Sequence, residues 1–348
     1  MRPLYFLGFA VLPAGALAQT ADTTLLTVDR WIQARAEADS FSGAVLVARN
    51  GIPVLRRGYG FANRETNEPV TPDTKFNLGS IDKLITRIAI WQLVAAGTLQ
   101  LDVPVGRYLP DYENKAVREQ VTARQLYEMR SGVGNFMNDA YLVRHAEIRT
   151  VDQYLELFAK DPLQFEPGTG MVYSNGGYII LGKLIECLTG MSYYDYVAKH
   201  ITGPLGMSAT QHYLIDAPVP NRAVGYTATQ GPLQPNTYSL AGRGSPAGGG
   251  YSTADDFLKL DAGLRTHRLL PAAFDSILGP NFKRGELVSY GGGGPGTNTQ
   301  YASWSDGLTI IVFSNRDPSS GTVVAQEIAK ALGRTIPGGQ RVIRRPGG

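Results

Sequence analysis

The order of strand-like and helix-like segments is the feature that most restricts how this chain of 348 residues folds. GAVLVARNGIPVLRRGYG (residues 43–60) contains two β-type runs around Asn50-Gly51, a dipeptide typical of tight hairpins. Two further β-type runs, GELVSYGGG and DGLTIIVFSN, lie near the other end of the chain. Strands at both ends, with helices between them, predict an antiparallel sheet built from the two terminal segments, beside a helical lobe.

Apolar periodicity predicts the main helices. LLTVDRWIQARAEA near the start and TVVAQEIAKALG near the end both have helical spacing. SIDKLITRIAIWQLVAAG begins at Ser80, carries apolar residues at i, i+3, i+4 and i+7, and ends at Gly97. The fold class is therefore α/β, of the α+β kind. We expect a sheet lobe at about 22–79 plus 246–334 and a helical lobe at about 80–245.

The first 18 residues, MRPLYFLGFAVLPAGALA, resemble a secretory signal peptide. Arg2 precedes an apolar stretch that ends in a small-x-small pattern just before Gln19. A membrane anchor is the alternative, but Pro13 and Gly15 interrupt a run that is already too short to span a bilayer. We therefore expect cleavage of residues 1–18, a periplasmic or secreted protein, and no membrane span.

Charge and cysteine content exclude several function classes. The net charge of +3 and the absence of a long basic run give no reason to expect nucleic-acid binding. Residues 335–348 form a short basic segment that we expect to be a flexible, solvated tail. Cys187 is the only cysteine, so no internal disulfide is expected; its helical apolar context predicts a buried, inert thiol.

The glycine-rich stretch SYGGGGPGTNTQ contains a formal G-x-G-x-x-G pattern. A dinucleotide site needs that pattern between a strand and the start of a helix. Here Pro295 and polar residues follow, and no βαβ unit surrounds them. No nucleotide or other cofactor is therefore expected.

Other catalytic arrangements are also absent from the sequence. The nucleophile elbow G-x-S-x-G does not occur, and no H-E-x-x-H pattern or ligand spacing indicates a metal. The histidines lie in polar contexts without a recognisable partner, and we expect each to be a surface residue: His145, His200, His212 and His267.

A lysine-assisted serine remains. Ser80 and Lys83 lie three residues apart at the start of a predicted helix, so both project from one face. A serine hydroxyl becomes a good nucleophile when a neighbouring base takes its proton, and a partly buried lysine of lowered pKa is such a base. The alternative is that Ser80 only caps the helix while Lys83 is solvated.

FNLGSIDKLITRIAI resembles the first motif of the serine β-lactamase and penicillin-binding protein superfamily. The similarity is strongest to the branch of class C β-lactamases, D-alanyl-D-alanine carboxypeptidases and family VIII carboxylesterases. It continues through FEPGTGMVYSNGGYIILGKLIECLTG and GGGYSTADDFLKL, from about residue 40 to 333. This resemblance implies one β-lactamase-like catalytic domain at 19–340, with Ser80 as nucleophile and Lys83 beside it.

The second motif of that family is Tyr-x-Asn, which occurs twice. Tyr112-Glu113-Asn114 lies in a charged loop, where we expect a surface tyrosine. Tyr173-Ser174-Asn175 follows Pro167-Gly168 and precedes a helix, as in the family. The resemblance therefore implies that Tyr173 relays protons to and from the nucleophile, and that Asn175 bonds Lys83 and a polar group of the substrate.

The third motif, Lys-Thr-Gly or His-x-Gly in the family, falls by register on Tyr290-Gly291-Gly292. Two glycines would let this strand approach the substrate closely. The backbone N–H groups of Ser80 and Gly293 would then form the oxyanion hole. Tyr290 provides a neutral phenol where relatives carry a cation for a substrate carboxylate, and in this it is more similar to the Trp-x-Gly of family VIII carboxylesterases.

ARQLYEMRSGVGNF also departs from the family pattern, L-L-x-H-x-S-G. Tyr127 replaces a leucine and Met129 the histidine, while Arg130 either supplies a cation to the site or faces water.

Three functions follow from the resemblance. The first is an exported serine carboxylesterase that forms an acyl-enzyme with small acyl esters. The second is a D-alanyl-D-alanine carboxypeptidase, D-aminopeptidase or weak class C-like β-lactamase. The third is a non-catalytic penicillin-recognising protein. Tyr290 favours the first, and the expected partner is a small-molecule ester, amide or β-lactam.

Overall fold

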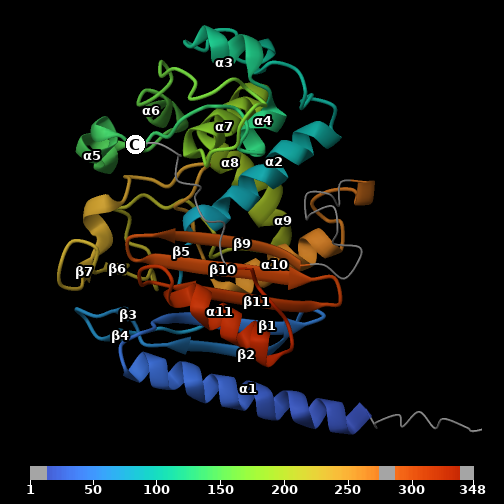
Figure 1. Ribbon diagram of the computed structural model, residues 1–348, viewed down its shortest axis with the longest axis vertical. Coiled ribbons are helices and arrows are strands. Elements are labelled where there is room, and N and C mark those ends of the chain that lie inside the picture. The colour runs from blue at the N-terminus through green and yellow to red at the C-terminus, as the bar shows by residue number, and fades with distance from the viewer. Residues whose placement is uncertain (1–13, 274–286, 338–348) are drawn as a thin grey trace, which may run out of the picture.

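A five-stranded antiparallel sheet, in the order β2-β1-β11-β10-β9, forms the centre of the molecule (Figure 1). This computed structural model describes residues 14–273 and 287–337. Its strands are β1 Gly43–Arg49, β2 Ile52–Tyr59, β9 Leu287–Gly294, β10 Thr297–Trp304 and β11 Leu308–Ser314. The sheet therefore joins the two terminal segments of the chain, as the sequence predicts.

Helices lie on both faces of the sheet and make up most of the lobe above it in Figure 1. The α-helices are α1 Ala14–Glu37, α2 Lys83–Ala95, α3 Lys115–Gln120, α4 Ala123–Tyr127, α5 Asp139–Arg144, α6 Val151–Leu155, α7 Asn175–Thr189, α8 Tyr193–Val197, α9 Gly203–Leu205, α10 Ala254–Arg265 and α11 Ser320–Ala331. The short helical turns are η1 Gly79–Asp82, η2 Val105–Arg107, η3 His145–Glu147, η4 Ala198–Thr202 and η5 Asn236–Ser239. Three two-stranded ribbons pair β3 Phe61–Asn63 with β4 Glu68–Pro69, β5 Phe76–Asn77 with β8 Tyr251–Ser252, and β6 Tyr226–Thr227 with β7 Gln234–Pro235.

The β1–β2 hairpin confirms the turn predicted at Asn50-Gly51. Both residues have positive φ (50° and 76°), which matches the right-handed twist of the flanking strands. By contrast, the sequence analysis did not identify β10. All eight of its residues are buried, but TNTQ at its start is polar, so the strand lacks the apolar run typical of a central strand.

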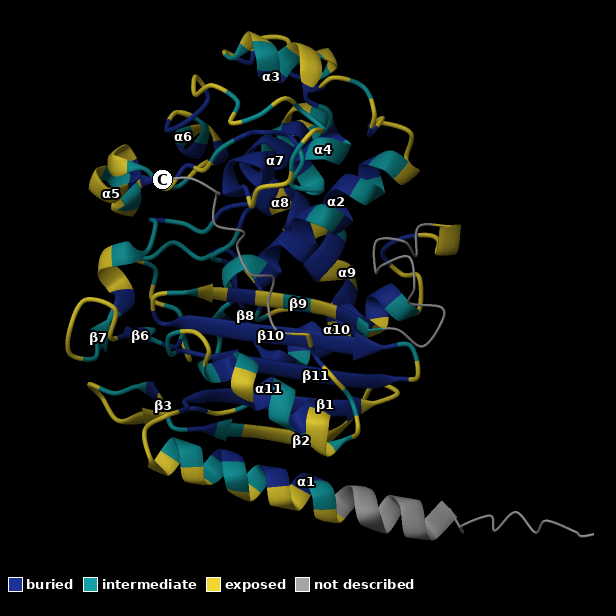
Figure 2. Ribbon diagram, viewed as in Figure 1, coloured by how far each residue is buried: buried dark blue, intermediate teal, exposed yellow. Residues whose placement is uncertain are grey.

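The sheet separates two apolar cores. Alternate residues of β1 and β11 point to opposite faces, so Val45 and Val312 pack with α1 and α11, whereas Leu46 and Phe313 pack towards α10 and the helical lobe. Figure 2 shows the resulting continuous burial of β1, β10 and β11 between these layers. The core on the α10 side of the sheet, which includes α2 and α7, extends into the helical lobe and supports the candidate site.

The structure overturns three expectations about individual side chains. Cys187 is exposed rather than buried, because it lies on the outward face of α7. Tyr112 is only 8% exposed, since its ring joins the core of the helical lobe. His212 is also buried, at 4% exposure, against the carboxylate of Asp82.

Two predicted segments lie largely or partly outside the described residues. The structure does not describe residues 1–13 of the expected signal peptide or residues 338–348 of the expected tail. In the ranges that are described, none of the helices combines the length and the apolar character that crossing a membrane requires.

Candidate active site

Ser80 lies in a tight turn between β5 and α2. Gly79 takes a φ of +53° and opens the 3₁₀ turn η1, which places Ser80 and Lys83 one turn apart. The Asn77 side chain accepts a hydrogen bond from the Gly79 N–H (2.8 Å), and the Leu78 N–H donates to Gly250 (2.8 Å). The turn that carries Ser80 is thus held from two sides.

Lys83 is buried, with 5% of its surface exposed. Its Nζ lies 3.3 Å from Ser80 Oγ and 2.7 Å from Asn175 Oδ1, and also bonds the carbonyl of Ala247. Burial lowers the pKa of Lys83 to about 7, although the negative charge of Asp82 acts in the opposite direction. A large fraction of Lys83 is therefore the neutral amine near neutral pH.

Tyr173 reaches Ser80 from the segment before α7. Its hydroxyl lies 2.5 Å from Ser80 Oγ, and 44% of the residue is exposed. Burial of the phenol raises its pKa, while the bond to Ser80 opposes this, so Tyr173 stays protonated at neutral pH. The neighbouring Ser174 caps α7 by accepting from the Gly177 N–H at 2.9 Å, which fixes the segment that carries Tyr173.

Asn175 is the first residue of α7 and connects two parts of the site. Its Oδ1 accepts from Lys83, and its Nδ2 donates to Asn135 at 3.3 Å. Because the amide nitrogen has its own acceptor, the oxygen is directed at Lys83.

Strand β9 forms the opposite edge of the site, next to η1. A Cβ on Gly292 would lie 2.3 Å from the Leu78 carbonyl and 2.9 Å from the Ser80 nitrogen, so only glycine permits this approach. The Gly293 nitrogen lies 3.1 Å from where a Cβ on Gly79 would be. Gly291 is exposed on the same strand. The glycine run therefore lets β9 pass close to the turn that carries Ser80, with the Gly293 nitrogen beside Gly79.

Arg87 is a site residue that the sequence analysis missed. It lies one turn beyond Lys83 on α2, and its Nη1 donates to the hydroxyl of Tyr290 (3.0 Å). Its guanidinium also lies over the rings of Tyr127 (4.7 Å) and Tyr290 (5.7 Å). The i, i+3, i+7 spacing of Ser80, Lys83 and Arg87 was a signal available in the sequence.

Asp82 and His212 were also missed. Asp82 is fully buried, its Oδ2 lies 2.7 Å from His212 Nε2, and it accepts from the Gly250 N–H at 2.8 Å. Asp82 thus joins the turn that carries Ser80 both to His212 and, through Gly250, to the segment that supplies Ala247 to Lys83. Asp82 and His212 are 130 positions apart, so no local pattern could have revealed the contact.

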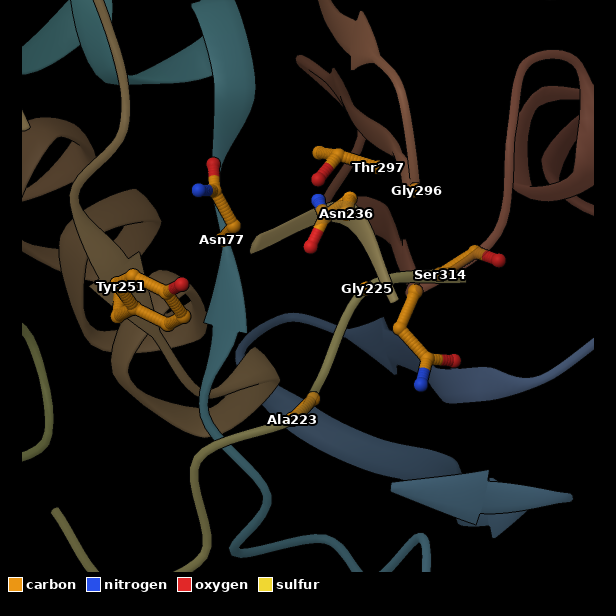
Figure 3. Close-up of a pocket in the computed structure, with 9 residues that line it drawn as sticks. Asn77, Ala223, Gly225, Asn236, Tyr251, Gly296, Thr297 and Ser314 are labelled. Carbon is orange, nitrogen blue, oxygen red and sulfur yellow. The ribbon is translucent and has the colours of Figure 1, made fainter. Parts of the chain in front are cut away.

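The remaining departures from the family pattern do not bring a cation to Ser80. Arg130 donates to the Gly168 carbonyl (2.5 Å), and the sulfur of Met129 accepts from the Ser174 N–H (3.4 Å). Among the described residues, no group of three or more His, Cys, Asp or Glu side chains is arranged to hold a metal. A small pocket, whose lining includes Asn77, Asn236 and Thr297, does not include Ser80 (Figure 3).

The fold and this lysine-assisted serine define the class of protein: a serine hydrolase built on the β-lactamase/transpeptidase-like fold. The family model named Beta-lactamase matches residues 28–334. This chain belongs to that family.

Individual relatives span different activities. Penicillin-binding protein 4* of Bacillus subtilis (strain 168) is 27% identical, over 85% of this chain and 72% of that protein. Esterase EstB of Burkholderia gladioli is 28% identical, over 83% of this chain and 79% of that protein. The crystal structure of a penicillin binding protein from Bacillus halodurans superposes with a TM-score of 0.75 at 26% identity, and covers 86% of this chain and 99% of its own.

Proposed function

We propose that the chain is an exported carboxylesterase that hydrolyses small acyl esters through an acyl-enzyme on Ser80. The observation that carries this proposal is the contact of Ser80 Oγ with both Tyr173 Oη (2.5 Å) and Lys83 Nζ (3.3 Å). The signal-peptide pattern of residues 1–18 supports export.

Lys83 is the base in this proposal. A neutral amine has two N–H donors and one lone pair, and Asn175 Oδ1 and the Ala247 carbonyl provide acceptors for the two donors. The lone pair is then left for the hydroxyl proton of Ser80 as Oγ attacks the acyl carbon. Tyr173, protonated at neutral pH, gives a proton to the leaving alkoxide and is reprotonated from Lys83. Water repeats the sequence and releases the acid.

The N–H groups of Ser80 and Gly293 are proposed to stabilise the tetrahedral oxyanion. The Gly292 carbonyl points towards β10, where it accepts from the Asn298 side chain at 3.2 Å. In a planar trans peptide the following N–H points the opposite way, so the Gly293 N–H is directed away from β10, across the free edge of β9. Each such donor is typically worth about 10²–10³ in rate.

Tyr290 supports an ester substrate. A neutral phenol at the third motif gives weaker pairing to a substrate carboxylate than an ammonium would. Exposed Gly291 and buried Gly292 continue this strand and would let it lie along the acyl group. The relative EstB is itself an esterase.

A second candidate function is supported by Arg87. Its guanidinium donates a hydrogen bond to the Tyr290 hydroxyl, and among the residues the structure describes it has no carboxylate partner. This positive charge favours substrates that carry a carboxylate, such as a D-alanyl-D-alanine peptide or a β-lactam. The second candidate is therefore a D-peptidase or weak β-lactamase that uses the same acyl transfer.

Parallel assays with a p-nitrophenyl ester, a chromogenic cephalosporin and a D-Ala-D-Ala peptide distinguish the two candidates. We expect ester turnover that is lost in Ser80→Ala, with no long-lived penicillin adduct. Rapid cephalosporin hydrolysis with negligible esterase activity, reduced in Arg87→Met, would instead establish the second candidate.

A further inference from the structure

The side chain of Asn298 lies on β10, the strand next to the edge strand β9, and links β9 to the start of α11. Its Nδ2 donates to the Gly292 carbonyl at 3.2 Å, and its Oδ1 accepts from the Thr322 N–H at 2.7 Å. Thr322 lies in the first turn of α11, where backbone N–H groups have no partner within the helix. One amide therefore bridges a helix N-terminus to the edge strand of the site.

Burial makes this arrangement costly unless it is fully bonded. Asn298 is 5% exposed, inside a strand whose residues are all buried. A buried amide without partners costs several kcal/mol, typically about 2–7, so an apolar residue would be the simpler choice for packing alone. Here the oxygen and the nitrogen each have a specific backbone partner, and the nitrogen bonds the peptide that carries the proposed oxyanion donor, the Gly293 N–H.

The dipoles along this path all point the same way. The Thr322 N–H donates to the Asn298 amide, this amide donates to the Gly292 carbonyl, and the same peptide presents the Gly293 N–H at the free edge of β9. Hydrogen-bonded amides in series polarise one another, by about 10–30% per bond. The positive end of the α11 dipole lies at the start of the chain of bonds.

We infer that Asn298 is a positioning residue that orients and polarises the Gly293 N–H for the oxyanion, with the N-terminus of α11 as its support. This inference rests on the proposed function, because it presumes that Gly293 is an oxyanion donor. In this inference, Asn298 and the start of α11 raise the acylation rate although neither belongs to the three family motifs.

Gln300 provides a matched control on the same strand. It is also 5% exposed, and its Nε2 donates to the Tyr290 carbonyl at 3.2 Å, two residues before Gly292. Asn298→Ala and Gln300→Ala therefore each remove a 3.2 Å bond to a carbonyl of β9, and Gln300→Ala also removes a 2.7 Å bond to Ser289 Oγ. Only the carbonyl bonded by Asn298 belongs to the peptide that carries the proposed oxyanion donor.

The test measures the acylation burst with a p-nitrophenyl ester, the KM, the unfolding temperature and the infrared band of a ¹³C=O-labelled acyl-enzyme. We expect Asn298→Ala to lower the acylation rate about tenfold, a part of the loss for a whole donor, with little change in KM. Its carbonyl band should move to higher wavenumber, because the carbonyl is hydrogen-bonded more weakly. Gln300→Ala should acylate within about twofold of the unmodified protein even if both variants lose similar stability.

Thr322→Pro is a second variant that leaves Asn298 and its packing in place. Thr322 is the third residue of α11, where the N–H makes no bond within the helix, so proline removes the N–H at the start of the bonded chain together with the threonine side chain, without breaking a helical hydrogen bond. We expect its carbonyl band to move in the same direction as that of Asn298→Ala, while the band of Gln300→Ala stays in place. This difference in the band decides the question if Asn298→Ala does not fold.

The outcomes separate the inference from the function on which it rests. Equal acylation rates and equal carbonyl bands in Asn298→Ala and Gln300→Ala would overturn the role of Asn298 alone. Failure of the unmodified protein to form any adduct on Ser80 would overturn the proposed function, and the inference with it.

Discussion

Lys83 illustrates how a common residue type acquires its chemistry from burial. Its position three residues after Ser80 was visible in the sequence, but its partners Asn175 and Ala247 come from distant segments. Those two acceptors receive the N–H groups of a neutral amine, and low solvent exposure disfavours the ammonium form. Local spacing therefore predicted that Lys83 lies beside Ser80, whereas the protonation state of Lys83 depends on the tertiary structure.

The pH dependence of acylation tests this assignment. Because burial lowers the pKa of Lys83 to about 7 and the neutral amine is the active form, kcat/KM for an ester should rise with pH and reach half its plateau near pH 7. A pH series of p-nitrophenyl ester hydrolysis measures it, with Ser80→Ala as the blank. If kcat/KM instead reached half its plateau near pH 10, the pKa of a solvated lysine, the base would not be a buried Lys83.

At the scale of elements, the site depends on the close approach of β9 to η1. The sequence analysis set aside a nucleotide-binding role for these glycines and predicted that they let the strand approach the site closely. It did not indicate β10, because the polar side chains of Asn298, Thr299 and Gln300 are satisfied by bonds to β9, to the residue before η1 and to α11, which only the folded chain supplies. Periodicity reports burial of apolar groups and so misses a buried polar strand.

Gly292→Ala should disrupt this approach. The new Cβ would lie 2.3 Å from the Leu78 carbonyl and 2.4 Å from Thr299 Oγ1, so β9 and η1 must move apart. We expect kcat/KM to fall by at least about 10², the typical effect of losing an oxyanion donor.

Gly294→Ala is the control for this substitution. No atom lies within 4 Å of the position of its Cβ, and its φ is not positive, so activity should be retained. Equal activity in the two variants would show that the distance between β9 and η1 is unimportant for catalysis.

At the scale of the whole molecule, the sheet separates the catalytic core from a second core under α1 and α11. The order of strands and helices predicted the sheet built from the two terminal segments and the helical lobe beside it, but not the separate core under α1 and α11. The buried Asp82–His212 pair was unpredictable, since each side chain alone resembles a solvated residue. Contacts between distant segments account for most of what the sequence did not indicate.

Ile32→Ala tests the independence of the two cores. Ile32 is fully buried between α1 and the sheet, on the face away from the helical lobe. Truncation should lower the free energy of unfolding by about 2–5 kcal/mol, while kcat at 25 °C should be unchanged. Denaturant unfolding and ester hydrolysis on the same sample measure both quantities; a large loss of kcat in the folded variant would mean that the cores are coupled.

The location of the acyl group is the most direct test of the central claim, that Ser80 is the nucleophile and Lys83 its base. The protein is mixed with a p-nitrophenyl ester, quenched with acid within the burst, and analysed by intact mass and peptide mapping. We predict one acyl group on the peptide that contains Ser80, none in Ser80→Ala, and a burst slower by several orders of magnitude in Lys83→Ala. An acyl group that persists in Ser80→Ala, or a normal burst in Lys83→Ala, would contradict the account.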